Sequence, residues 1–190
     1  FTVDRVTSKV EAWDVTTGQS VPFRAADPRG VSHLAVSEDA SSLALVTASP
    51  VEGNFIALQD GVTSAHLRTI EGPPAFITAL AMRPDGEEIT TGSSLSVLTR
   101  WSLSTGEMGN VSPWNEPGPV ESLSYDGPGA QIAWTLGTYF VRVREAKTGR
   151  TIRQWKPHGD QQVIFAGFLP GKTDLITAGR DGSVMRWDLS

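Results

Sequence analysis

One short phrase returns along the chain at a nearly constant spacing. It reads VEAWDVTTG at residues 10–18, LTRWSLSTG at 98–106, VRVREAKTG at 141–149 and VMRWDL at 184–189, with a divergent copy, IALQD, at 56–60. The residues at the tryptophan position are Trp13, Gln59, Trp101, Arg144 and Trp187. The steps between them are 46, 42, 43 and 43 residues. A period of this length indicates one supersecondary unit repeated along the whole chain.

The last repeat shows best what this unit is. Residues 162–168 are mostly apolar, as expected of a strand buried on both faces, and a turn follows at 169–172. Residues 174–178 form a second predicted strand. The Asp-Gly pair within 180–183 predicts a tight hairpin turn, after which 184–189 form a third strand.

The same order recurs upstream. The corresponding first strands are predicted at 31–36, 76–82 and 120–125. A short fourth strand follows each Thr-Gly turn, as at 151–155. No stretch sustains a helical apolar period over 11 or more residues. The sequence therefore predicts an all-β chain built from four-stranded antiparallel meanders of about 43 residues.

Composition restricts the chemistry. Of the 190 residues, 39% are hydrophobic, which is not a disordered composition. The chain has no cysteine, which excludes disulfides, thiolate metal sites and a cysteine nucleophile. No apolar run approaches the roughly 20 residues that a membrane-spanning helix needs. We expect no membrane association and a cytoplasmic location.

Charge is low overall and uneven. The net charge of −5 argues against nucleic-acid binding as the function. Residues 1–95 carry −6 and residues 96–190 carry +1. Six basic residues lie close together in the second half: Arg142, Arg144, Lys147, Arg150, Arg153 and Lys156. We expect a solvated outer strand, where charge opposes edge-to-edge pairing, with a patch for an anionic partner as the alternative.

This pattern resembles the WD-repeat (tryptophan–aspartate repeat) β-propeller family over essentially the whole chain. Trp13-Asp14 and Trp187-Asp188 keep both letters of the dipeptide. The resemblance implies a hydrogen-bonded network in each blade, which maps in the last repeat onto His158, Thr177, Asp181 and Trp187. The other repeats depart from it: Leu95 stands at the position of Asp181, and Arg144 at that of Trp187.

The resemblance also implies a domain organisation. We expect one propeller region over 1–190, with a partial blade at 1–24, blades at about 25–70, 71–113 and 114–156, and three final strands at 157–190. That is about four and a half blades, whereas the family commonly has about seven. We therefore expect the C-terminal blades of a larger propeller, whose remaining blades are supplied in cis or in trans.

Catalytic signals are weak. His33, His66 and His158 lie in different repeats without metal-ligand spacing, and all three are expected to be structural. No Gly-x-Ser-x-Gly or Walker-type loop is present. We expect no enzyme activity, no metal and no cofactor. The alternative is part of a propeller enzyme whose site is completed by other blades.

A binding face follows from the resemblance. Propellers of this family mostly bind peptides or protein surfaces through the loops that lead into the first strand and the loops that join the second and third strands. Arginine and large aromatic residues carry most interface energy. The candidate binding residues are Arg24, Arg29, Trp114, Asn115, Glu116, Tyr139, His158, Asp160 and Arg180. Trp114, in a proline-rich loop, either contacts a partner or covers a neighbouring blade. The expected function is a non-catalytic scaffold or sensor that binds a protein or peptide.

Overall fold

The computed structural model describes residues 1–4, 9–21, 23, 30–49, 53–109, 114–115, 118–136 and 139–189, with backbone only at 48–49 and 114–115. All regular structure in these residues is β-strand, so the predicted all-β class is confirmed. No helix in this part of the chain is long and apolar enough to cross a membrane. The strands form antiparallel meanders in which each strand pairs with the next in the chain.

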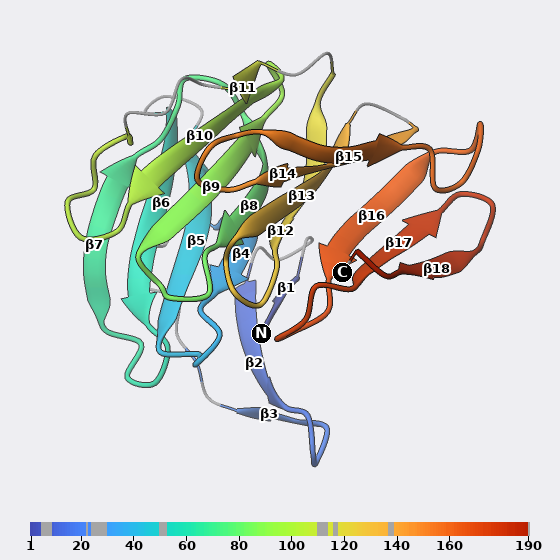
Figure 1. Cartoon of the computed structure of the whole chain (residues 1–190). Helices are drawn as coiled ribbons and strands as arrows, with labels where there is room; N and C mark the ends of the chain where they lie inside the picture. The colour runs from blue at the N-terminus through green and yellow to red at the C-terminus, as the bar shows by residue number, and fades with distance from the viewer. Residues whose placement is uncertain are drawn as a thin grey trace. The chain divides into compact units, whose positions relative to one another are not determined.

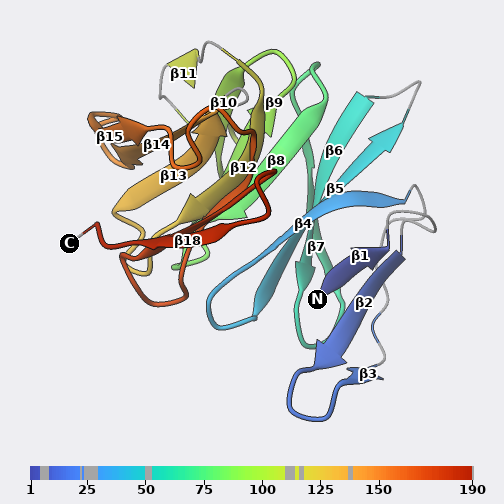
Figure 2. The same ribbon diagram turned by 90° about the vertical axis from the view of Figure 1, so that its right-hand side faces the viewer.

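The chain divides into two compact units, Phe1–Pro74 and Ala75–Ser190. The first unit holds two sheets. Sheet 1 comprises β1 (Thr2–Asp4), β2 (Lys9–Asp14) and β3 (Gln19–Val21), and Figure 2 shows β1 alongside β2. Sheet 2 comprises β4 (Val31–Val36), β5 (Ser42–Ser49), β6 (Gly53–Asp60) and β7 (His66–Glu71), which lie in chain order in Figure 1.

The second unit holds three sheets. Sheet 3 comprises β8 (Ile77–Met82), β9 (Glu88–Ser93), β10 (Val97–Ser102) and β11 (Trp114–Asn115). Sheet 4 comprises β12 (Val120–Tyr125), β13 (Gln131–Leu136), β14 (Phe140–Glu145) and β15 (Thr151–Trp155). Sheet 5 comprises β16 (Val163–Phe168), β17 (Leu175–Gly179) and β18 (Val184–Trp187). The first strand of sheet 4, β12, lies beside both β8 and β16.

One boundary differs from the sequence prediction. Trp114 and Asn115 were expected in a loop leading into the next repeat, after a boundary at residue 113. The structure instead pairs them with Leu98 and Val97, at the outer edge of sheet 3. In the described residues 107–109, near the expected fourth strand, β10 makes an isolated bridge from Trp101 to Met108. A two-residue edge strand carries too little periodicity to be found from sequence.

A β-bulge recurs at the same place in four sheets. In each of these sheets the first strand has one more residue than the second strand between two paired positions. These positions are Val31 and His33, Ile77 and Ala79, Val120 and Leu123, and Val163 and Phe165. The residue ahead of the bulge is buried in every case: Val31, Ile77, Val120 and Val163. A bulge bends its strand and increases the local twist. The shared position shows that the four sheets repeat one backbone design.

Small side chains let the sheets of the second unit approach each other closely. Ala79, Ala81 and Leu98 of sheet 3 share a core with Ile132 and Trp134 of sheet 4. The opposite face of sheet 4 shares a core with sheet 5 through Ala133, Val141, Val143, Val163, Ala166 and Leu175.

Hydroxyl groups join the first strands of adjacent sheets. Thr78 Oγ1 donates to the carbonyl of Val120 at 2.6 Å. The N–H groups of Ala166 and Phe168 donate to Ser122 Oγ and Ser124 Oγ at 3.1 and 3.0 Å. These bonds satisfy polar groups where the apolar cores meet, and they fix the register of one sheet against the next.

The first unit is assembled on the same plan. Val10 of sheet 1 shares a core with Val31, Leu43, Leu45 and Ala57 of sheet 2. The ring of Phe1 packs edge-on against that of Phe23, with centroids 5.1 Å apart.

Gly92 provides a test of this close packing. A Cβ at this position would lie 2.7 Å from Val120 Cγ1 and 2.8 Å from Val120 Cβ. Val120 is fully buried, so it has little room to move. We expect Gly92→Ala to lower the free energy of unfolding by about 1–3 kcal/mol, measured by urea denaturation. The control is Gly109→Ala, where the nearest atom would lie 3.7 Å away. Equal stability of the two variants would contradict close sheet packing at Gly92.

Candidate functional site

A chain of hydrogen bonds centred on the buried residues Thr177 and His158 crosses sheet 5. Trp187 Nε1 donates to Thr177 Oγ1 at 2.9 Å, and Thr177 Oγ1 lies 2.9 Å from His158 Nε2. His158 Nδ1 lies 3.0 Å from Asp181 Oδ2. The chain is consistent if Thr177 donates to Nε2 and the protonated Nδ1 donates to the carboxylate. The structure thus brings together the four residues that the resemblance mapped onto the last repeat.

The local backbone explains how His158 is held. A Cβ on Gly179 would lie 2.5 Å from His158 Cγ, so glycine makes room for the imidazole. Asp181 is positioned by its own turn, where the N–H of Ser183 donates to Asp181 Oδ1 at 2.9 Å. This backbone hydrogen bond, with the Ser183 hydroxyl and His158, holds the pKa of Asp181 below its usual value. The network is therefore a structural support beneath the loop at 156–162.

The tryptophan-to-threonine bond is a repeated feature. Trp101 Nε1 donates to Thr91 Oγ1 at 3.0 Å in sheet 3, and Trp13 Nε1 donates to Thr2 Oγ1 at 2.9 Å in sheet 1. In sheets 3 and 5 the indole is on the third strand and the hydroxyl on the second, whereas in sheet 1 Trp13 is on β2 and Thr2 is on β1. Trp101 is buried, whereas Trp13 is 43% exposed.

In sheet 4 the tryptophan lies at the position that holds threonine in sheets 3 and 5. The tryptophan position holds Arg144, and the threonine position holds Trp134, as the strand registers show. Trp134 is fully buried, and the guanidinium of Arg144 lies 5.4 Å from its ring centroid. Arg144 Nε also donates to Thr151 Oγ1 at 3.2 Å. A cation–π contact and a hydrogen bond thus replace the indole–hydroxyl bond.

Predicted binding residues meet on one loop surface. Lys156 Nζ donates to Asp160 Oδ1 at 2.9 Å and lies 5.5 and 5.4 Å from the ring centroids of Tyr139 and Phe140. Tyr139 is 40% exposed, and Asp160 is exposed. We call Tyr139, Phe140, Lys156 and Asp160 the loop-end cluster. Ion pairing with Lys156 lowers the pKa of Asp160.

The other predicted binding residues are placed differently. His158 is buried, so it supports this surface rather than contacting a partner directly. Arg180 is exposed, and its N–H donates to the carbonyl of Gln162. Arg24, Arg29 and Glu116 lie outside the described residues, and only the backbone is described for Trp114 and Asn115.

The basic residues between 142 and 156 are held by several different partners. Arg142 donates to Gln154, the Arg150 guanidinium lies 3.6 Å from Glu145, and Arg153 lies over the ring of Trp155. Arg144 and Lys156 contact Trp134 and the loop-end cluster, as described above. Among the described residues, Lys147 alone of the six makes no side-chain hydrogen bond, ion pair or ring contact.

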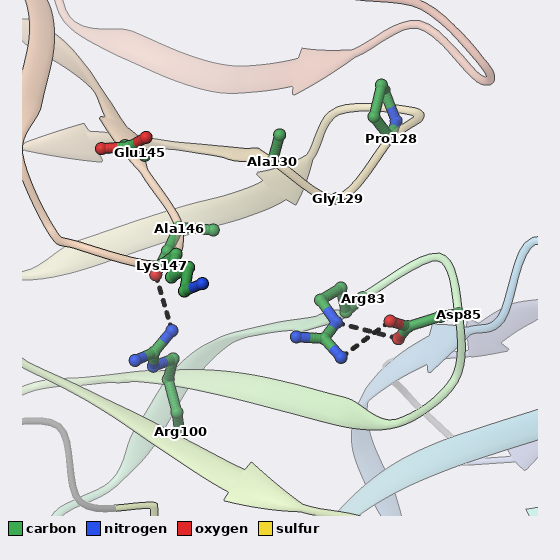
Figure 3. A pocket seen from close by; sticks show the side chains of 9 residues that line it. All are labelled: Arg83, Asp85, Arg100, Pro128, Gly129, Ala130, Glu145, Ala146 and Lys147. Atoms are coloured by element: carbon green, nitrogen blue, oxygen red, sulfur yellow. Dashed lines mark hydrogen bonds and ion pairs between the residues drawn. The ribbon is translucent and has the colours of Figure 1, made fainter.

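A cavity lies at the opposite end of sheets 3 and 4, where the turns after β8, β12 and β14 meet. Its volume is about 540 Å³. It is lined by Arg83, Asp85, Arg100, Pro128, Gly129, Ala130, Glu145, Ala146 and Lys147 (Figure 3). The cavity is not evident from the sequence, because its lining comes from three turns and the strands beside them in two different repeats. The signal available in the sequence was one basic residue in each of two turns, Arg83 and Lys147.

A buried polar network lies next to this cavity. Tyr125 OH donates to Glu88 Oε1 at 3.0 Å and accepts from Thr90 Oγ1 at 2.6 Å. Arg100 Nη1 lies 3.7 Å from Glu88 Oε1 and donates to the carbonyl of Ala146 at 2.6 Å. Burial and the adjacent Glu88 carboxylate raise the pKa of Tyr125, so the phenol stays protonated. The network links sheet 3 to sheet 4 and fixes the Arg100 side chain at the cavity.

Metal binding has no support in the described part of the chain. No group of three or more His, Cys, Asp or Glu side chains there could hold a metal ion. His33 and His66 make local contacts with Ser32 and Thr69 respectively.

Comparisons with known proteins add no assignment. No protein-family model matches the chain, and no curated protein matches it at a significant level.

The network of sheet 5 can be tested at Thr177, whose hydroxyl is shared by Trp187 and His158. Thr177→Val removes this hydroxyl from a fully buried position at nearly constant volume. We expect a loss of about 2–4 kcal/mol in the free energy of unfolding, because a buried indole N–H and an imidazole nitrogen lose their partner. Thr177→Ser keeps the hydroxyl and should lose about 1 kcal/mol for the missing methyl. Urea denaturation of both variants makes the comparison, and a valine variant no less stable than the serine variant would refute the network.

Proposed function

We propose that this chain is a non-catalytic protein- or peptide-binding module, built from blades of a WD-repeat-type propeller. The observation that best supports this proposal is the loop-end cluster. It places exposed aromatic and charged side chains above the hydrogen-bonded network of His158 and Thr177. Aromatic side chains with nearby charges are the groups that dominate binding energy at protein interfaces. The proposal retains a scaffold or sensor role in the cytoplasm.

Three structural features support the propeller part of the proposal. The sheets are antiparallel meanders, and their first strands lie side by side within the second unit. The indole–hydroxyl bond and the bulge recur from sheet to sheet. Propeller blades are four-stranded antiparallel meanders of this kind, arranged around a central channel.

The proposal includes further sheets of the same kind as partners. Sheets 3 and 4 each use one face to pack on the following sheet. In sheet 5 the corresponding face carries Phe165 and Val184, which are 49% and 70% exposed. A further sheet, from the same or another chain, is the occupant that this face fits, because it would continue the packing of sheets 3 to 5.

Light scattering tests this open face. We expect the purified chain to associate at tens of micromolar concentration, with a mass above the 20.4 kDa of one chain. Val184→Lys should shift the mass towards one chain, because it places a charge in the apolar face. Val15→Lys is the control, since Val15 is 93% exposed in a turn. A stable single-chain mass for the unmodified protein would refute the proposed neighbour.

Peptide selection tests the binding function. The probe is the peptide most enriched from a library of random dodecapeptides displayed on phage and selected on the intact chain. We expect Tyr139→Ala to weaken binding of this peptide about tenfold or more, measured by isothermal titration calorimetry. The control is Met108→Ala, which removes an exposed side chain from the opposite end of the strands. Failure to enrich any peptide, or equal affinity for both variants, would argue against a binding surface at the loop-end cluster.

A further inference from the structure

We propose that the cavity between the turn ends of sheets 3 and 4 binds a phosphate-like oxyanion. This site lies at the other end of the strands from the loop-end cluster and does not depend on the function proposed above. Three basic side chains line it: Arg83 in the turn after β8, Arg100 on β10 and Lys147 in the turn after β14. In Figure 3, Arg83 and Lys147 extend toward the space between the two sheets.

The Arg83 guanidinium is held by hydrogen bonds from Nε and Nη2, and its Nη1 group is not engaged by them. Nε and Nη2 contact Asp85 at 2.9 and 2.7 Å, and Nη2 also donates to Glu87 at 3.0 Å. The side-chain stem lies against the turn at Gly129, where a Cβ would come within 3.0 Å of Arg83 Cγ. No described residue accepts from Nη1. The guanidinium is therefore held in place with two N–H groups available to a ligand.

Lys147 supplies an unpaired charge on the facing wall. Its side chain is exposed, and no described group pairs with its ammonium. Glu145 lies two residues before Lys147, but it accepts a hydrogen bond from the Thr148 hydroxyl and pairs with Arg150. Figure 3 shows the Glu145 carboxylate directed away from Arg83 and Arg100. The lysine charge is thus left for a ligand.

The turn that carries Lys147 also has free backbone donors. In the related turns of the first unit, Asp14 accepts the N–H groups of Thr16 and Thr17, and Asp60 accepts those of Val62 and Thr63. The head of the turn after β14 is Glu145, whose longer side chain bonds Thr148 Oγ1 instead. Among the described residues, nothing accepts the N–H groups of Lys147 and Thr148.

These donors favour a tetrahedral oxyanion. The guanidinium and the ammonium stand on two different sheets, so they approach the cavity from separate directions. A phosphate group presents oxygens in several directions, whereas a carboxylate presents two in one plane. Of the two carboxylates in the lining, Asp85 is paired with Arg83 itself and Glu145 with Arg150. Arg100 is partly buried beside Glu88 and is the third basic residue of the lining.

The experiment uses the intact chain and two lysine variants. Sodium phosphate is compared with sodium chloride at equal ionic strength, and thermal unfolding is followed as the salt is added. We expect a saturable rise in Tm with phosphate only. Lys147→Gln should weaken the apparent phosphate affinity about tenfold, because it removes one charge-assisted contact. Lys172→Gln, an exposed lysine outside the cavity lining, should leave it unchanged.

Two further titrations identify the source of the oxyanion. A short peptide containing phosphoserine and the same peptide with glutamate are added to the unmodified chain and to Lys147→Gln. Tighter binding of the phosphoserine peptide than of inorganic phosphate, weakened by Lys147→Gln, assigns the site to a phosphorylated protein segment. Equal or tighter binding of inorganic phosphate assigns it to a small phosphate compound. Phosphate no different from chloride, equal loss in both lysine variants, or a preference for the glutamate peptide would overturn the proposal.

Discussion

The close approach of first strands is the constraint on which the second unit depends. β12 packs between β8 and β16, and its neighbours can come near only because the facing positions are small. Ala79 and Ala81 meet the large Trp134, while Ser122 and Ser124 bond directly to the backbone of β16. Large residues on one face are therefore matched by small residues or hydroxyls on the next. Complementary sizes of this kind give a core its density without strain.

Polar groups take part in this packing instead of being excluded from it. In sheets 1, 3 and 5 an indole N–H donates to a threonine hydroxyl on the preceding strand. A similar polar contact joins sheets 3 and 4, where the Tyr125 hydroxyl donates to the Glu88 carboxylate. A buried polar group without a partner costs about 1–3 kcal/mol, so these bonds are requirements of burial. The same bonds hold Arg100 and His158, which lie beneath the two surfaces proposed to bind ligands.

Periodicity was sufficient to predict the class and most of the strands. The regular steps between Trp13, Gln59, Trp101, Arg144 and Trp187 show one strand pattern repeated in phase along the chain. Such a pattern is hard to produce by chance. The hydrogen bonds among His158, Thr177, Asp181 and Trp187 lie where family resemblance placed them. Local pattern did not identify β11, since a two-residue strand is defined by its partner β10 alone.

The two surfaces show the limit of sequence reasoning more clearly. The loop-end cluster joins Tyr139 to Lys156 and Asp160, and only Tyr139 and Asp160 were predicted to bind. The cavity joins Arg83 to Lys147, which are 64 positions apart in the chain. Each residue alone has the appearance of an ordinary surface charge. Their proximity follows from the packing of sheet 3 on sheet 4, which no single repeat encodes.

The exchange of sizes between Arg144 and Trp134 bears on how a chain of similar sheets finds its correct order. Repeat proteins are prone to pair a segment with the wrong copy of its neighbour. The face of sheet 4 that presents Trp134 packs on Ala79 and Ala81 of sheet 3, and larger side chains at those two positions would overpack it. Divergence at Arg144 and Trp134 thus makes the packing face of sheet 4 different from those of the other sheets. It is a source of folding specificity that a perfectly regular repeat would lack.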